Sequence, residues 1–159
     1  MSSARKVVRE RGTSCFNAAR MKRLPQTYAF LICDQAFQML PTGKWCVIGT
    51  FDAILVGDLP VRFPPFQVFL SLGEFMGDSM VEVVMRDDQG DVVYAVRGQV
   101  PPIPDSSPLS NFELSMPFPN VEFKREGSHS VELSVDGHVI AVRSLRVHKG
   151  APQEGSASE

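Results

Sequence analysis

The first group in this chain that could do chemistry is the thiol of Cys33, which Asp34 follows directly in the run AFLICDQAFQ (residues 29–38). A nucleophilic cysteine needs a lowered pKa, which a histidine or a helix N-terminus supplies and a neighbouring carboxylate opposes. Alternation along a β-strand puts Cys33 on the face of Gln35. Asp34 then falls on the opposite face, with Ala36. We therefore expect a small buried thiol at position 33 and a polar residue near the rim of a sheet at position 34.

Three cysteines are present, an odd count with no Cys-x-x-Cys pair, and this is typical of free thiols in a reducing compartment. A disulfide between Cys33 and Cys46 is not expected, because a turn at Thr42-Gly43 would place Cys46 opposite about Met39. The longest clean apolar run, residues 29–32, is far shorter than the roughly 20 residues of a membrane span or the ~7–15 of a signal-peptide core. These features favour a cytoplasmic protein without membrane association.

Groups that could bind a metal or activate a substrate are sparse in the sequence. The chain has three histidines, but a hairpin over this region separates them, and we expect surface side chains rather than a zinc site. They are His129, His138 and His148. Asp87, Asp88 and Asp91 lack the spacing of a calcium loop and are interpreted as a solvated turn. Nucleophile-elbow, His-Glu-x-x-His and glycine-rich phosphate motifs are missing, so we expect no enzyme, no metal and no cofactor.

The elements that would position these groups are short β-rich runs separated by turn residues, a pattern typical of an all-β sandwich or barrel. We expect about eight strands, arranged as a two-sheet antiparallel β-sandwich that is immunoglobulin-like or related, with mostly local pairing. The expected strands cover residues 28–37, 45–56, 66–72, 80–86, 92–100, 112–118, 129–135 and 138–147.

Several residues predict details of this sandwich. Gly49 indicates a bulge or a close backbone approach within its strand. Pro117 cannot donate to a ladder, which predicts an edge strand over residues 112–118. The proline-rich segment 101–108 is expected to carry the chain from one sheet to the other. In the last hairpin, Asp136-Gly137 predicts a type I′ turn, and a slip in alternation predicts a bulge near Arg143-Ser144.

Three regions are expected along the chain: a basic leader over residues 1–24, the sandwich over 25–149, and a disordered tail over 150–159. The leader carries seven basic residues against one acidic residue, whereas the formal charge of the whole chain is −2. It is interpreted as a disordered leader or as sequence upstream of a natural start at Met21. A nucleic-acid-binding tail is the less favoured alternative, because the leader has little aromatic interleaving and the body is acidic.

Four segments resemble an uncharacterised bacterial family that is known only as a domain of unknown function. They are FLICDQ (30–35), TGKWCVIGTFDAILV (42–56), LPVRFPPFQVFLSL (59–72) and SVELSVDGHVIAVRSLRV (130–147). The resemblance covers roughly residues 28–148, with the first forty the most distinctive. It implies a small β-sandwich of bacterial source and carries no catalytic residue across. The basic leader falls outside the pattern, in keeping with a later start.

The leading hypothesis is a non-enzymatic protein-binding or assembly module that uses an edge strand or rim loops. The candidate interaction residues are Asp34, Gln35, Trp45 and Phe63. The alternative is a small-molecule or carbohydrate binder, in which Trp45, Phe63 or Phe66 forms a stacking platform, unless these rings belong to the core. A hydrolase with an unrecognised site is the third hypothesis. A protein partner is expected, and nucleic acid is not.

Overall fold

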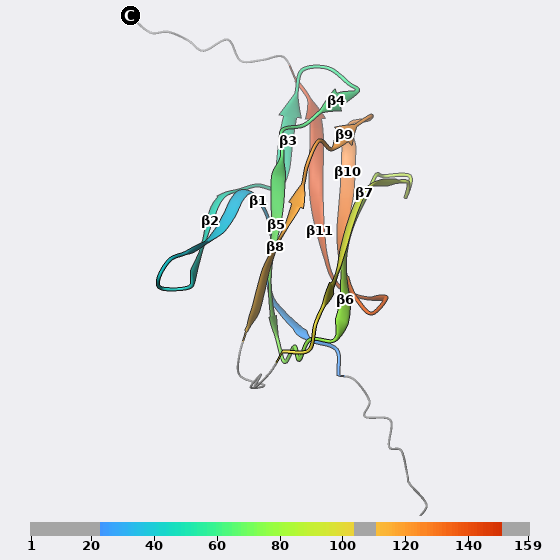
Figure 1. Cartoon of the computed structure of the whole chain (residues 1–159). Helices are drawn as coiled ribbons and strands as arrows, with labels where there is room; N and C mark the ends of the chain where they lie inside the picture. Colours follow the sequence, from blue (N-terminus) through green and yellow to red (C-terminus); the bar gives the residue numbers. More distant parts are fainter. Residues whose placement is uncertain (1–22, 104–110, 151–159) are drawn as a thin grey trace, which may run out of the picture.

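Two β-sheets pack face to face in this computed structural model, which describes residues 23–103 and 111–150 (Figure 1). The all-β, two-sheet sandwich expected from the strand pattern is confirmed. No helix in the described part of the chain is long and apolar enough to cross a membrane. The predictions for the basic leader, for Cys15, for the middle of the proline-rich connection and for the C-terminal tail fall outside the described residues.

The four-stranded sheet has the order β2-β1-β5-β8. Its strands are β1 (Gln26–Met39), β2 (Lys44–Thr50), β5 (Phe66–Gly73) and β8 (Phe112–Phe118). All its pairs are antiparallel. The edge position of β8 confirms the prediction from Pro117, which lies opposite Gln67 without needing a donor.

The five-stranded sheet has the order β3-β11-β10-β6-β7. Its strands are β3 (Ala53–Val56), β6 (Ser79–Arg86), β7 (Val92–Val100), β10 (Gly127–Val135) and β11 (His138–Lys149). A separate short ladder joins β4 (Val61–Arg62) to β9 (Glu122–Phe123). Asp136 and Gly137 have φ angles of 50° and 80°, as the predicted type I′ turn requires. Since β7 and β8 belong to different sheets, the proline-rich connection joins the sheets as predicted.

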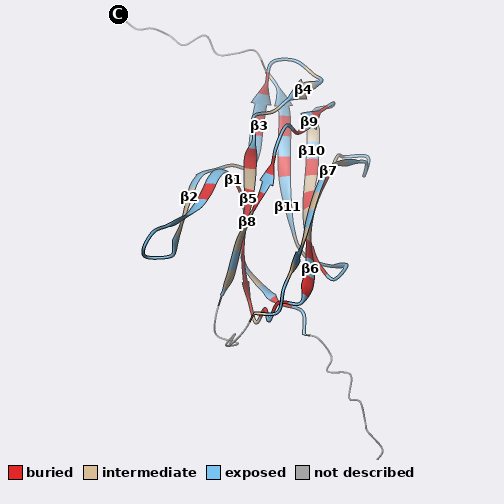
Figure 2. Cartoon of the chain, viewed as in Figure 1, coloured by how far each residue is buried: buried red, intermediate tan, exposed pale blue. Residues whose placement is uncertain are grey.

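Alternation along the central strands places their apolar side chains between the sheets. Phe66, Val68, Leu70 and Leu72 of β5 are all buried in the main core, opposite the inward row of β6 and β10 (Figure 2). Phe69 points to the other face of its sheet, where it belongs to a second, smaller cluster. A strand buried on both faces in this way stabilises the sandwich through apolar burial, the dominant favourable term in folding.

The segment expected to be one strand over residues 45–56 instead forms β2 and β3, which lie in different sheets. Its middle crosses between the sheets: the N–H of Phe51 donates to Ile32 O (3.1 Å), and the carbonyl of Asp52 accepts from the N–H of Arg146 (2.9 Å). β3 then pairs in parallel with the end of β11. Within the described residues, β3–β11 is the only parallel pair, so the expectation of antiparallel pairing fails for it alone. The expectation of mostly local pairing is wrong, because the β1–β5, β5–β8 and β6–β10 pairs also join strands far apart in the sequence.

The bulge predicted near Arg143-Ser144 is misplaced. The register of β10 against β11 shifts between Leu133 and Ser134, which leaves Ile140 as the extra residue close to the turn. Arg143 pairs regularly with Val131 and reaches the other sheet, where Nε donates to Phe30 O (2.8 Å). The apparent slip in the apolar pattern at residues 142–145 is therefore explained by an arginine in the row of Leu145, and not by a bulge at that point.

Candidate functional site

The outer part of the β1–β2 hairpin, residues 34–49, projects beyond the two packed sheets and is called the arm here (Figure 1). Figure 2 shows that most of its surface is exposed. Phe37 pairs with Cys46 and Gln35 with Ile48, so the register predicted from the turn is displaced by two residues. Cys46 remains distant from Cys33, which pairs with Thr50, and both thiols are free as expected.

A small apolar cluster anchors the arm to the outer face of the four-stranded sheet. Cys33, Ala36 and Phe69 are buried in it, and the ring centroids of Trp45 and Phe69 lie 5.3 Å apart. Cys33 and Ala36 therefore share one cluster, whereas strict alternation predicts opposite faces for them. Asp34 and Gln35 lie between them and are both exposed.

The break in alternation coincides with Gly49 on the partner strand. Gly49 has a φ of 66°, a left-handed conformation that side-chain-bearing residues rarely adopt. A Cβ at this position would collide with the Asp34 carboxylate, which rests against the glycine backbone. The close approach predicted at Gly49 is confirmed, and it explains why Asp34 is followed by a change of face.

One face of the arm presents large apolar side chains to solvent. Phe37, Met39 and Ile48 share this face through cross-strand pairing and are 44%, 42% and 48% exposed. Leu40 at the tip is 90% exposed. Contiguous exposed apolar residues of this kind mark interaction surfaces more often than scattered ones do. None of these residues is among the predicted interaction residues, although their alternation in AFQML is visible in the sequence.

The arm groove is a pocket of about 330 Å³ that separates the arm from the ends of β5 and β8. It is lined by Asp34, Gln35, Ala36, Phe37, Pro65, Phe66, Gln67, Pro117 and Pro119. Gln67 Oε1 accepts from the N–H of Ala36 (2.9 Å) and from Ser115 Oγ (2.6 Å). Its Nε2 group donates to no other group of the described residues. The groove therefore offers an acceptor at Asp34 and a donor at Gln67 within an apolar, proline-rich lining.

The structure brings together only two of the four predicted interaction residues. Asp34 and Gln35 line the arm groove, whereas Trp45 packs on Phe69 and serves to attach the arm. Phe63 lies half-buried among Phe51, Phe66 and Phe123, with ring centroids 6.0–6.2 Å away. Phe66 is 1% exposed, so it cannot act as a stacking platform.

Cys33 has the electrostatics of an inert thiol. Burial, and then the neighbouring Asp34 carboxylate, raise the pKa of the Cys33 thiol, and a backbone hydrogen bond offsets this only in part. The side chain is fully buried, and its sulfur lies 3.6 Å from Gln67 O. The interpretation of this thiol–carboxylate pair as unsuited to nucleophilic catalysis agrees with this environment.

In a chain carrying Cys15→Ser, we expect a thiol reagent at neutral pH to label Cys46 readily. Cys33 should react at least about a hundredfold more slowly, because its exposure requires the protein to open. Mass spectrometry of the time course measures both rates. Adding Cys46→Ser gives the control that follows Cys33 alone, and similar rates for the two thiols would contradict the assignment.

The histidine prediction is wrong for one of the three residues. His138 and His148 are exposed, but His129 is only 1% exposed and stands edge-on to the Phe123 ring, with centroids 5.2 Å apart. His129 lies two residues before Val131 and therefore belongs to the same inward-facing row of β10. This spacing is visible in the sequence and could have predicted that His129 is buried. Within the described residues, no three His, Cys, Asp or Glu side chains lie together as metal ligands would.

The aspartate cluster forms the predicted polar turn between β6 and β7. Asp87 Oδ1 accepts from the N–H groups of Gln89 (3.0 Å) and Asp91 (2.9 Å), and Oδ2 accepts from Arg125 (2.6 Å). Burial would raise the pKa of the Asp87 carboxyl, but these backbone donors and the guanidinium outweigh it and lower the pKa overall. The carboxylate is thus engaged in holding its own turn.

Two solved structures are similar to this chain at low sequence identity. An alkylpurine DNA glycosylase of Pseudomonas fluorescens, bound to DNA with an abasic site analogue, matches with a TM-score of 0.47 and 9% identity. The match covers 78% of this chain and only 30% of the glycosylase. An immunoglobulin-like protein of Pseudomonas aeruginosa matches with a TM-score of 0.40 and 12% identity, over 80% of this chain and 99% of that one. Neither similarity is close enough to transfer an activity.

Among curated proteins, no sequence matches this chain. A family model does match, over residues 28–148, a span that includes both sheets, the arm and the closing hairpin. The resemblance noted in the sequence therefore holds over most of the chain. The chain belongs to the family of unknown function DUF6941.

Proposed function

We propose that this protein is a non-enzymatic binding module that contacts another protein through the arm and the arm groove. The observation that carries the proposal is the apolar face of Phe37, Met39 and Ile48, held away from the sandwich by a hairpin that is anchored on its other side. Burying such a face would remove apolar surface from water, the main source of affinity in protein association. The three side chains would be the anchors of the contact.

A protein partner suits this surface better than a small ligand does. β2 is an edge strand of its sheet, so its outer N–H and C=O groups are available to pair with a strand of another chain. Asp34 and Gln67 add one acceptor and one donor beside the apolar face, which would orient an extended segment. An edge strand with a nearby acceptor and donor would bind a peptide segment by shape and hydrogen bonding, which requires no nucleophile or general base.

The test places a photo-crosslinking amino acid at position 37 or 39 of the full chain, in cells that carry its gene. Both positions should give the same discrete adduct, identified by mass spectrometry. Introducing Ile48→Asp in the same chain should lower the adduct yield about tenfold, because a charge would enter the apolar contact.

The matched control uses Val139, an exposed apolar residue on β11 that is 56% exposed. A crosslinker at position 139 should not give this adduct, and Val139→Asp should leave the adduct from position 37 unchanged. Fluorescence of Trp45, the single tryptophan, checks that the arm stays docked in each variant. Adducts that are equal at positions 37 and 139, or unaffected by Ile48→Asp, would refute the proposal.

A further inference from the structure

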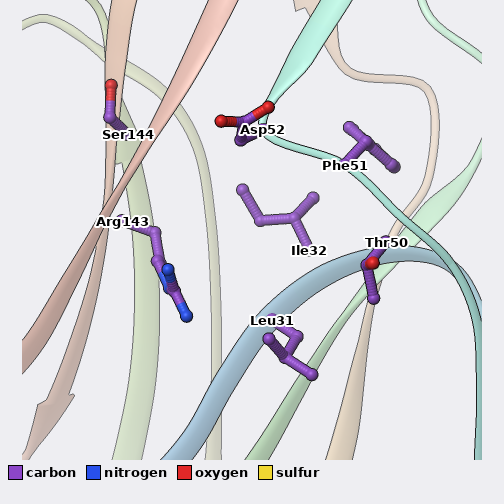
Figure 3. A pocket seen from close by; sticks show the side chains of 7 residues that line it. All are labelled: Leu31, Ile32, Thr50, Phe51, Asp52, Arg143 and Ser144. Atoms are coloured by element: carbon purple, nitrogen blue, oxygen red, sulfur yellow. The ribbon is translucent and has the colours of Figure 1, made fainter.

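A second pocket, of about 410 Å³, lies at the lateral opening of the sandwich, on the side where the chain crosses from β2 to β3 (Figure 3). This volume is within the range of ordinary small-molecule sites. The pocket, called the lateral pocket here, is lined by Leu31, Ile32, Thr50, Phe51, Asp52, Arg143 and Ser144. None of these residues lines the arm groove.

The opening exists because β2 covers only part of the edge of β1. The β1–β2 ladder runs from Met39 back to Cys33, and beyond Thr50 the chain turns away toward the other sheet. The uncovered edge of β1 therefore faces β11. Arg143 is exposed at this opening and spans it by donating from Nε to Phe30 O at 2.8 Å.

Arg143 retains most of its hydrogen-bonding capacity. Only Nε is engaged, and within the described residues no carboxylate forms an ion pair with this guanidinium. Its terminal N–H groups have the planar, paired geometry that binds a carboxylate through two parallel hydrogen bonds. Thr50 adds a hydroxyl group to the lining of the same pocket, whereas the Ser144 hydroxyl is hydrogen-bonded to Ser128 Oγ at 2.8 Å.

The opposite charge stands across the pocket at Asp52, with Ile32 between the two charged side chains (Figure 3). Asp52 pairs with Arg146 at 3.1 Å, but the two side chains are 77% and 56% exposed, so this pair contributes little and can exchange for a ligand. Ile32, which is 4% exposed, lies between the charges, and Leu31 and Phe51 supply the rest of the apolar lining. Within the described residues Arg143 and Asp52 form no ion pair with each other, and Ile32 lies between them in Figure 3, so a ligand that contacts both needs a spacer between its two charges.

We propose that the lateral pocket binds an elongated zwitterionic small molecule. The ligand's carboxylate would accept two hydrogen bonds from the terminal N–H groups of Arg143, and its ammonium group would bind Asp52. An apolar spacer between the two charges would lie over Ile32. Short peptides with free termini and ω-amino acids are ligands of this class, whereas an α-amino acid has no apolar spacer between its charges.

The probe is 6-aminohexanoate, titrated into the full chain and followed by backbone amide NMR. We expect saturable shifts at Thr50, Phe51, Asp52 and Ser144, with a dissociation constant of about 1 mM or lower. Hexanoate and hexylammonium, which each keep one charge, should bind about tenfold more weakly, and so should glycine, which lacks the spacer. The amides of Phe37 and Met39 on the arm should not shift, which separates this test from that of the proposed function.

Two substitutions test which residue binds each charged end of 6-aminohexanoate. Asp52→Asn is at an exposed position that should not affect folding, and it should reduce binding of 6-aminohexanoate to the level of hexanoate. Arg143→Gln should reduce it to the level of hexylammonium, and Arg97→Gln, at an exposed arginine on β7, should change nothing. Absence of saturable shifts at the lateral pocket would overturn the proposal. So would equal binding of all four probes, or affinity that Asp52→Asn leaves unchanged.

Discussion

Replacing Phe66 with alanine is expected to lower the free energy of unfolding by about 4 kcal/mol and the melting temperature by about 10 °C. The side chain is 1% exposed and lies at the centre of an aromatic cluster. Its ring centroid is 5.2 Å from Phe118, 5.8 Å from Phe51 and 6.0 Å from Phe63. Truncation would remove these contacts and leave a cavity that three rigid rings cannot close.

Urea denaturation followed by circular dichroism measures this loss. The matched control is Val142→Ala on β11, where the side chain is 58% exposed and truncation should change stability by less than about 0.5 kcal/mol. If Phe66→Ala lost no more than that control, Phe66 would not be a core residue, and the alternative of an aromatic binding platform would return. A matching Phe63→Ala variant should lose less than Phe66→Ala, because Phe63 is only half-buried.

The second large effect is expected at Gly49, where valine should lower the free energy of unfolding by about 3 kcal/mol. The left-handed φ of 66° strains any side-chain-bearing residue, and β-branched residues most. In addition, the new Cβ would strike the Asp34 carboxylate. Because the arm bends away at this point, we expect the substitution to release the arm from Phe69 and shift Trp45 fluorescence to longer wavelength.

Two variants separate the causes of this effect. Gly57→Val is the matched control, because Gly57 has no heavy atom within 4 Å of an added Cβ and is not among the residues with positive φ. Adding Asp34→Ala to Gly49→Val relieves the collision but not the backbone strain, so it should recover only part of the lost stability. Full recovery would show that the conformation of Gly49 is not strained, and no loss in Gly49→Val would show that Asp34 does not rest on it.

The two proposed contacts of this protein both depend on the point where the chain leaves β2 and crosses to the other sheet. β2 leaves β1 at Thr50, which uncovers the edge of β1 at the lateral pocket, and the same hairpin extends outward as the arm. Substitutions at Asp52 and Ile48 therefore probe separate surfaces. Loss of one contact with retention of the other would show that the two proposals stand independently.

Strand positions and inward faces could be predicted because both depend on local patterns. Val81, Val83 and Met85 alternate with polar residues, and all three are buried. Asp136-Gly137 requires a tight turn through its own backbone conformation, and it forms one. Pro117 excludes a central strand because it lacks an N–H group. Each of these properties depends on one residue or on its nearest neighbours, so it can be predicted directly from the sequence.

The tertiary structure alone decided how these strands meet. The chain changes sheets at Phe51 and Asp52 because β3 finds its partner in β11, about ninety residues away in the sequence by the pairing of Ala53 with Arg146. His129 is buried where it stands edge-on to the Phe123 ring, and the exposed Arg143 reaches the other sheet because the Phe30 carbonyl accepts its Nε hydrogen bond.

The stretch around Cys33 and Asp34 shows both contributions. Its apolar alternation predicts a strand, and the carboxylate beside the thiol argues against a nucleophile; both inferences use only neighbouring residues. The polar interval at Asp34 and Gln35 has its explanation on another strand, in the left-handed backbone of Gly49 and in the docking of Trp45 on Phe69. A period-of-two pattern reports which side of a strand faces inward, but contacts between distant strands determine where that pattern breaks and which grooves result.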